Sequence, residues 1–258
     1  MAEDHKIIPS IITIVGDSLV LPRQFQQVEF HHTYPYLLAQ WLRDQGRPAE
    51  VWGSSNAGST ISQLMKRYDE YRTYVGQHPK GIGVVHLGVV DCSPRPIPSW
   101  LRRVVGKLPG LLRSPIIKFL HNYRVQLLRY GPGFLLTSHR KFRQTYRQLL
   151  DQMRQDFGRV YAVNIIPPGT HFESRSPGVG RKIVEYNAII AEVVEAAGDI
   201  ELVDIWSICQ EPEALETYVS EHDGHHLSID GHQRIFEMLV GGRTAGELLH
   251  EGLAVQTA

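Results

Sequence analysis

The chain has 258 residues, 42% of them hydrophobic, and a mean hydropathy of −0.21, which predicts one domain with a sizeable core. Basic (Lys and Arg) and acidic (Asp and Glu) residues both number 27, so the overall charge gives no reason to expect nucleic acid as a partner. The two cysteines show no metal-type spacing, and we expect both thiols to be reduced.

The N-terminal residues 1–6 include two acidic side chains, and the apolar run that follows them is interrupted at Gly16. This pattern is typical neither of a secretory signal nor of a membrane span. We therefore expect a cytoplasmic protein.

A short β-branched run, residues 11–15, predicts a buried strand that stops at Gly16. Ser18 follows two residues later. In an open α/β sheet, ligands bind at the carboxyl ends of the strands, so Ser18 would be accessible to a substrate. The alternative is an ordinary turn, because glycine, aspartate and serine all favour turns.

The rest of the chain alternates between helical and strand patterns. Such alternation predicts a parallel sheet with helices on both faces. The predicted strands after the first are 50–52, 82–87, 160–166 and 200–205; the predicted helices are 33–46, 61–75, 138–157, 183–197 and one that begins at Ser228. Residues 53–60 form a run of small residues, and residues 206–222 form a loop rich in Glu and His.

The segment 92–147 contains twelve Lys and Arg residues and no Asp or Glu. Part of it predicts amphipathic helices, with Trp100, Val104 and Leu108 on one face and basic side chains off that face. One interpretation is a helical insertion, at about 92–137, that packs on the sheet edge. The other is that residues 95–130 contact an anionic membrane or an anionic substrate.

The motif Asp223-Gly224-His225-His226 lies near the other end of the chain. An aspartate three residues before a histidine can hold one imidazole nitrogen and leave the other free to take a proton from a serine. With Ser18, this gives a nucleophile, a base and an orienting carboxylate. A metal site is the less favoured interpretation of this cluster, because one short group is poor evidence for it.

Gly16-Asp17-Ser18-Leu19 and Asp223-x-x-His226, in this order and at opposite ends of the chain, resemble the first and last blocks of the GDSL, or SGNH, hydrolases. The resemblance selects His226 among the neighbouring histidines His222, His225 and His232. It implies a three-layer α/β/α sandwich with a five-stranded parallel, flavodoxin-like sheet. It also implies a Ser18, His226 and Asp223 triad that needs no metal or cofactor, with an oxyanion held by the backbone amides of Ser18 and Gly58.

The chain departs from the third block of this family. Gly88-Val89-Val90-Asp91 stands where Gly-x-Asn-Asp is usual, so Val90 replaces an asparagine that donates to the oxyanion. Loss of one such donor costs roughly 10²–10³ in rate. Asn56 and Arg95 are the candidate substitutes. Asp17 and Asp91 are expected to support the site, with Asp91 bracing its loop.

The resemblance implies a serine hydrolase that cleaves carboxylic esters, with acyl or acetyl groups on lipid or carbohydrate as the substrate class. Two alternatives are kept. One is acyl transfer to a glycan by the same serine. The other is a binding protein with weakened catalysis, which Val90 motivates.

Overall fold

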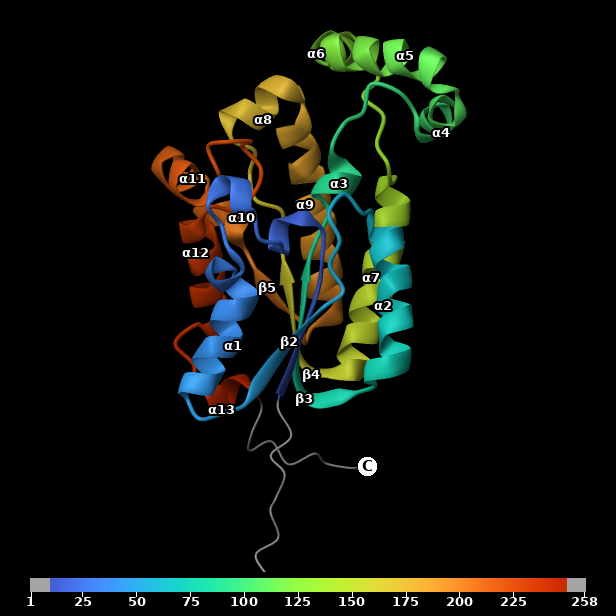
Figure 1. Cartoon of the computed structure of the whole chain (residues 1–258). Coiled ribbons are helices and arrows are strands. Elements are labelled where there is room, and N and C mark those ends of the chain that lie inside the picture. The colour runs from blue at the N-terminus through green and yellow to red at the C-terminus, as the bar shows by residue number, and fades with distance from the viewer. Residues whose placement is uncertain (1–9, 250–258) are drawn as a thin grey trace, which may run out of the picture.

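The computed structural model of the chain describes residues 10–249, so residues 1–6, on which the expectation about a targeting signal depends, lie outside it. At its centre is a sheet of five parallel strands in the order β2-β1-β3-β4-β5 (Figure 1). These strands are β1 (Ser10–Gly16), β2 (Ala49–Gly53), β3 (His78–His86), β4 (Phe157–Val163) and β5 (Glu201–Val203). The predicted five-stranded parallel sheet is confirmed.

Long helices cover both faces of this sheet (Figure 1). On one face, α1 (Tyr34–Asp44) and α12 (Ile229–Val240) bury Leu38 and Ile235 completely. On the other face lie α2 (Ile61–Val75), α7 (His139–Asp156) and α9 (Val179–Ala197). The predicted three-layer arrangement is therefore confirmed, with one apolar core on each side of the sheet.

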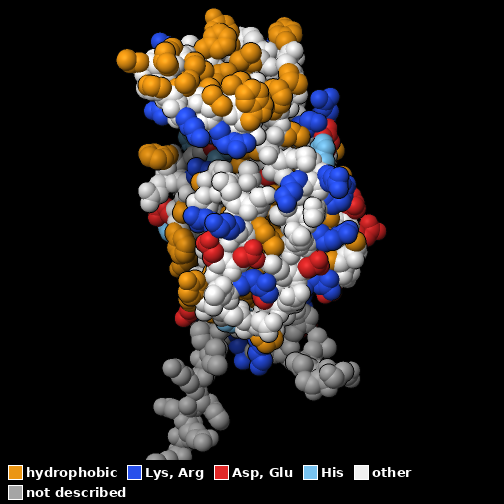
Figure 2. Space-filling model, turned by 90° about the vertical axis from the view of Figure 1, so that its right-hand side faces the viewer, with side chains coloured by type: hydrophobic (Ala, Val, Ile, Leu, Met, Phe, Trp, Pro, Cys, Tyr) orange, Lys and Arg blue, Asp and Glu red, His pale blue; other side chains and the backbone are white. Residues whose placement is uncertain are grey.

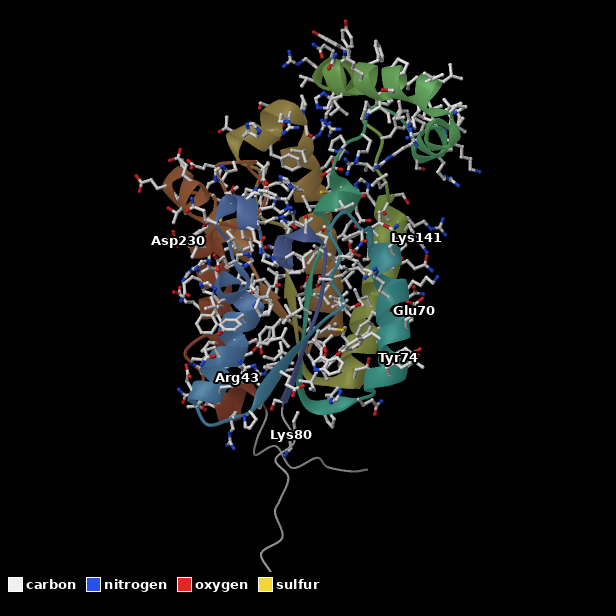
Figure 3. All side chains as sticks on the ribbon, in the orientation of Figure 1. Arg43, Glu70, Tyr74, Lys80, Lys141 and Asp230 are labelled. Carbon is white, nitrogen blue, oxygen red and sulfur yellow. The ribbon has the colours of Figure 1, made fainter. Side chains whose placement is uncertain are left out.

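The outer sides of these helices are polar, as amphipathic patterning requires. Glu70 on α2, Lys141 on α7 and Asp230 on α12 all point away from the sheet (Figure 3). Within residues 10–249, no helix combines the length and the apolar character needed to cross a bilayer.

Shorter elements complete the described chain. They are the 3-10 turns η1 (Ser18–Val20), η2 (Gln24–Gln26) and η3 (Phe30–His32), and the helices α3 (Val89–Cys92), α4 (Ser99–Lys107), α5 (Gly110–Asn122), α6 (Arg124–Tyr130), α8 (Thr170–Arg175), α10 (Ile205–Ile208), α11 (Pro212–Tyr218) and α13 (Ala245–Leu248).

Some of the predicted boundaries were wrong. Residues 206–222 are not all loop, because α10 and α11 lie there: the Asp204 carboxylate caps α10 by accepting from the Ser207 amide, and Pro212 suits the first turn of α11. Strand β3 begins at His78, four residues before the apolar run that identified it, and its pairing with β4 is irregular over this polar stretch.

Helices α4, α5 and α6 stand beyond the carboxyl ends of the strands, and we call residues 99–130 the cap (Figure 1). The chain enters and leaves the cap through a short antiparallel contact in which the backbones of Arg95 and Phe134 exchange two hydrogen bonds of 2.8 and 2.9 Å. The side chain of Arg124 adds bonds to the Pro94 carbonyl and to Ser176 in the body.

Asp91 joins three of these elements. Its buried carboxylate accepts from the first amide of α2, that of Ile61, at 3.0 and 3.2 Å, and from the hydroxyl of Thr137 just before α7. This agrees with the expected bracing role. Burial outweighs these hydrogen bonds and raises the pKa of Asp91 to about 7.

The raised pKa of Asp91 predicts a particular dependence of stability on pH. Between about pH 4 and pH 7 the folded protein holds a proton at Asp91 that the unfolded chain has released, so this contribution is present at low pH and lost as pH rises through 7. Asp91→Asn stays neutral throughout. Urea unfolding at several pH values should show the wild type losing stability relative to Asp91→Asn across this window, by up to about 1.4 kcal/mol per pH unit.

Asp151→Asn is the matched control, since Asp151 is an exposed aspartate on α7. It should follow the wild-type profile. A constant difference between wild type and Asp91→Asn from pH 4 to pH 8 would show that Asp91 does not titrate in this range.

Candidate active site

The loop after β1 is held in a fixed position by a buried carboxylate. One Asp17 oxygen accepts from the Leu19 amide at 3.0 Å and the other from the Gly88 amide, at the end of β3, at 2.9 Å. Gly16 precedes it, and a Cβ there would lie 2.7 Å from Val20 and 2.8 Å from the His86 carbonyl. Glycine at 16 and aspartate at 17 therefore place Ser18 at the start of η1, beside the loop after β3.

Ser18 lies against the turn contributed by the C-terminal part of the chain. The Nε2 atom of His226 is 2.9 Å from the Ser18 hydroxyl, and its Nδ1 atom is 2.6 Å from an Asp223 carboxylate oxygen. The exposed fractions of Ser18 and His226 are only 6% and 5%. The three residues suggested by the sequence thus meet in the order of serine, imidazole and carboxylate.

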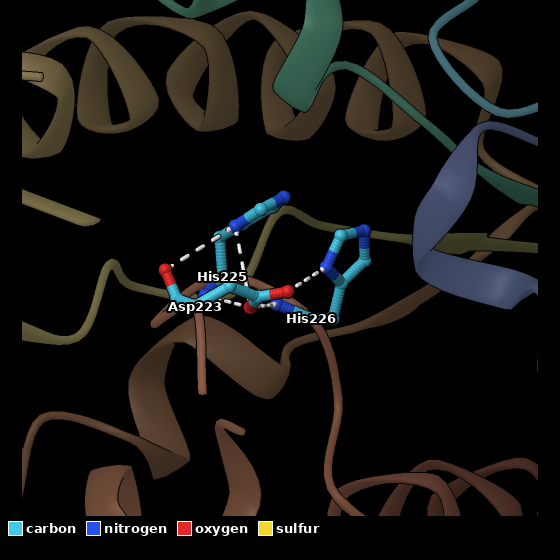
Figure 4. Close-up of side chains that lie close together, drawn as sticks. All are labelled: Asp223, His225 and His226. Atoms are coloured by element: carbon cyan, nitrogen blue, oxygen red, sulfur yellow. Dashed lines mark hydrogen bonds and ion pairs between the residues drawn. The ribbon is translucent and has the colours of Figure 1, made fainter. Parts of the chain in front are cut away.

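Hydrogen bonds within the turn from Asp223 to His226 stabilise its conformation (Figure 4). The other Asp223 oxygen accepts from the amides of both His225 and His226 at 3.1 Å. Gly224 between them has φ +71°, and a Cβ there would lie 2.7 Å from the Phe172 amide, so glycine is required. These backbone bonds fix the carboxylate relative to the imidazole ring.

Electrostatics favour an ionised carboxylate at this turn. Burial raises the pKa of Asp223, but the hydrogen bond from His226 and the charges of the two histidines outweigh it and hold this pKa well below its ordinary value. Burial, together with the neighbouring His226, lowers the pKa of His225 to about 4. Near neutral pH, Asp223 is therefore charged and His225 is neutral.

Two further side chains reach the site, and no motif in the sequence indicated them. The guanidinium of Arg23 contacts Nε2 of His226, and the Gln26 amide donates to Asp223 at 2.5 Å. Both come from residues 21–32, which carry no regular apolar pattern. The loop folds back through an Arg23–Val28 bridge and a positive φ of 60° at Gln27. Only this fold-back brings Arg23 to His226, and no sequence motif marks it.

The predicted oxyanion residues lie in different places. Gly58 has φ +72° in the exposed loop after β2, whose Asn56 amide donates to the Gly16 carbonyl at the end of β1. The side chain of Asn56 donates to Ser59 within that loop. Val90 is buried in α3 and carries no donor in its side chain.

Arg95 lies in the wall of a pocket that the cap helices form. Among the hydrogen bonds of residues 10–249, none joins the side chain of Asn56 or Arg95 to Ser18 or His226. That Asn56 or Arg95 donates to the oxyanion in place of the missing asparagine stays a prediction.

Asp223, His225 and His226 offer three ligand atoms within 4.8 Å of one another, as a metal site requires. Their other contacts fit hydrogen bonding better. The Nδ1 of His226 lies at hydrogen-bond distance from Asp223, and the cationic guanidinium of Arg23 sits at its Nε2. A second cation at this place would be repelled.

The sequence model of the GDSL-like lipase/acylhydrolase family matches residues 14–234. A comparison with the curated proteins found no match.

Solved structures share the fold at low sequence identity. The lipase/acylhydrolase from Enterococcus faecalis is 14% identical with a TM-score of 0.61, covering 92% of this chain and 96% of its own. The acetyl xylan esterase AlAXEase is 16% identical (TM-score 0.57, covering 91% and 100%), and TesA is 18% identical (TM-score 0.54, covering 93% and 99%).

The family match spans both the loop of Ser18 and the turn of His226, and the architecture is the one these structures share. The chain is therefore an ester hydrolase that belongs to the GDSL-like lipase/acylhydrolase family.

Proposed function

We propose that the protein cleaves carboxylic esters through Ser18, His226 and Asp223. The observation that carries this proposal is the pair of contacts of the His226 ring, 2.9 Å to the Ser18 hydroxyl and 2.6 Å to Asp223. An imidazole oriented by a carboxylate at one nitrogen presents its other nitrogen to the serine as a general base.

In the proposed reaction, the Ser18 oxygen attacks the ester carbonyl and its proton passes to Nε2 of His226. Charged Asp223 stabilises the imidazolium that forms. His226 then gives the proton to the leaving alcohol, which departs and leaves an acyl group on Ser18. Water, activated by His226, attacks this acyl group and releases the acid, which restores Ser18.

The backbone amides of Ser18 and Gly58 are the proposed donors to the tetrahedral oxyanion.

Arg23 is proposed to assist the attack of Ser18 on the ester carbonyl. In the resting site both its guanidinium and the Ser18 hydroxyl face the single lone pair of Nε2. When substrate enters, Arg23 can turn to a substrate oxygen, which frees Nε2 for the serine proton and adds a charged donor.

The substrate class we propose is an acyl or acetyl ester on a lipid or a carbohydrate. The similar structures include acetyl xylan esterases and a lipase/acylhydrolase, which supports both kinds of alcohol. The reaction at Ser18 is the same whether the alcohol belongs to a lipid or to a carbohydrate.

Replacement of the nucleophile tests the proposal. Ser18→Ala should lower kcat/KM for p-nitrophenyl acetate and butyrate by at least about 10³-fold, because no other group would form the acyl intermediate. Ser174→Ala, at an exposed serine on α8, should keep the wild-type rate. Equal rates for Ser18→Ala and wild type would refute the triad.

A xylooligosaccharide acceptor in the same assay tests acyl transfer to a glycan. Mass analysis of the products would reveal such transfer as an acylated sugar.

Val90 gives a second prediction. Val90→Asn should raise kcat for the same esters by about tenfold or more, because it restores a donor whose loss costs roughly 10²–10³. Val90→Leu is the control, as it changes shape without adding a donor. If Val90→Asn leaves the rate unchanged or lowers it, another donor already serves the oxyanion, and Arg23 is the first to test.

We also propose that the cap contacts anionic membrane surfaces. Large apolar side chains gather on the cap and Lys and Arg lie along its lower edge (Figure 2). The most exposed are Leu111, with an exposed fraction of 91%, and Tyr130, with 82%. Apolar side chains next to cations, in a segment without any acidic residue, complement a lipid interface with negative headgroups.

Vesicle sedimentation at low salt tests this contact. The wild type should sediment with phosphatidylglycerol vesicles and much less with phosphatidylcholine vesicles, since the basic residues favour anionic lipid. The double variant Leu111→Ser, Phe119→Ser should lose most of this binding. Tyr74→Ser, at an aromatic residue on α2 with an exposed fraction of 88%, should keep it (Figure 3). Absence of wild-type binding to the anionic vesicles would remove the proposal.

A further inference from the structure

The cap forms a partly open pocket of about 530 Å³, lined by residues 95–97 and by helices α4, α5 and α6. Its basic lining is unusually dense: Arg95, Arg102, Arg113, His121 and Arg124. The remaining wall includes apolar side chains, among them Ile97 and Val105. Ile117 belongs both to this lining and to the exposed apolar surface of the cap, whereas the most exposed apolar side chains, Leu111 and Tyr130, lie outside the lining.

Within residues 10–249, no carboxylate forms an ion pair with the arginines of this pocket. No acidic residue occurs among the described residues that line it, and the whole segment 92–147 contains none. The Nε of Arg95 is buried and makes no hydrogen bond within residues 10–249. By contrast, Arg72 and Arg143 pair with the carboxylates of Asp156 and Glu192.

The crowding of positive charges in this pocket changes the pKa of Arg95. Burial, and then the neighbouring guanidinium groups of Arg124 and Arg102, lower the pKa of Arg95 to about 10. The group still carries its charge near neutral pH. The Arg124 guanidinium donates to the Pro94 and Arg175 carbonyls and to the Ser176 hydroxyl, and these bonds hold it beside the cluster.

We propose that this pocket binds a phosphate group. Four arginines line this pocket, and the buried Nε of Arg95 has no partner within residues 10–249. Such a lining suits an anion with more than one charge and three or more oxygens, as phosphate has, whereas a single carboxylate carries only one charge. Ile97 and Val105 would contact the carbon atoms that carry the phosphate.

The pocket lies close to the reaction site along the chain. Asp17 binds the amide of Gly88, α3 follows from Val89 to Cys92, and Arg95 enters the pocket three residues later. A molecule whose phosphate group is bound in this pocket would therefore lie at the carboxyl ends of the strands, where Ser18 also lies. Binding itself needs no hydrolysis, so its test is independent of the proposed triad.

Calorimetric titration of the full chain with inorganic phosphate and with glycerol 3-phosphate tests the proposal. The wild type should bind, and Arg102→Gln and Arg95→Gln should each weaken binding by about tenfold or more, because each removes a charge-assisted hydrogen bond. Arg102 is exposed at the rim, so its variant should fold even if the Arg95 variant does not. Arg103→Gln removes the same charge from the next position of α4, outside the lining, and should bind as the wild type does.

Vesicles of phosphatidic acid in phosphatidylcholine form a second arm that identifies the source of the phosphate. Loss of vesicle binding in Arg102→Gln but not in Arg103→Gln supports a lipid headgroup, and the same pattern with glycerol 3-phosphate alone supports a soluble phosphate ester. Equal affinities of Arg102→Gln and Arg103→Gln in both arms, or absence of binding in both, overturns the proposal.

Discussion

The hydrogen bond between Ser18 and His226 joins residues 208 positions apart, and the arrangement of the site depends on it. It can form because β1 is an interior strand, paired to β2 on one side and β3 on the other, so its carboxyl end lies next to the loops that follow both neighbouring strands. The last turn reaches this point because α12 packs on α1, beside the same strand. Sheet order and helix packing thus determine whether the serine and the imidazole meet.

The main helices and strands and the two site motifs could be predicted from the sequence, for physical reasons. Long amphipathic patterns such as residues 138–157 specify a helix and its buried face, and β-branched runs such as 11–15 specify buried strands. The two motifs of the site were equally visible, since each consists of residues adjacent in the chain. Strand β3 was placed too short because its first residues are polar, and α10 and α11 were missed because each spans only one or two turns.

The parts that the sequence did not reveal are those that depend on irregular backbone. Arg23 and Gln26 reach the imidazole and its carboxylate only because residues 21–32 turn back on themselves, and neither residue belongs to a recognisable pattern. The surroundings of Arg95 were also not predictable from the sequence, because they depend on the Arg95–Phe134 pairing and on the cap pocket that Arg95 lines. Local motifs identify the reacting groups, while loops decide what surrounds them.

The paired backbones of Arg95 and Phe134 have an evolutionary implication. Because the two ends of the cap segment lie side by side, the residues between them can grow, shrink or be exchanged without altering the spacing of β3 and β4 in the sheet. A lineage could therefore acquire a new recognition surface in one insertion event, while an older hydrolytic framework beneath it keeps its geometry.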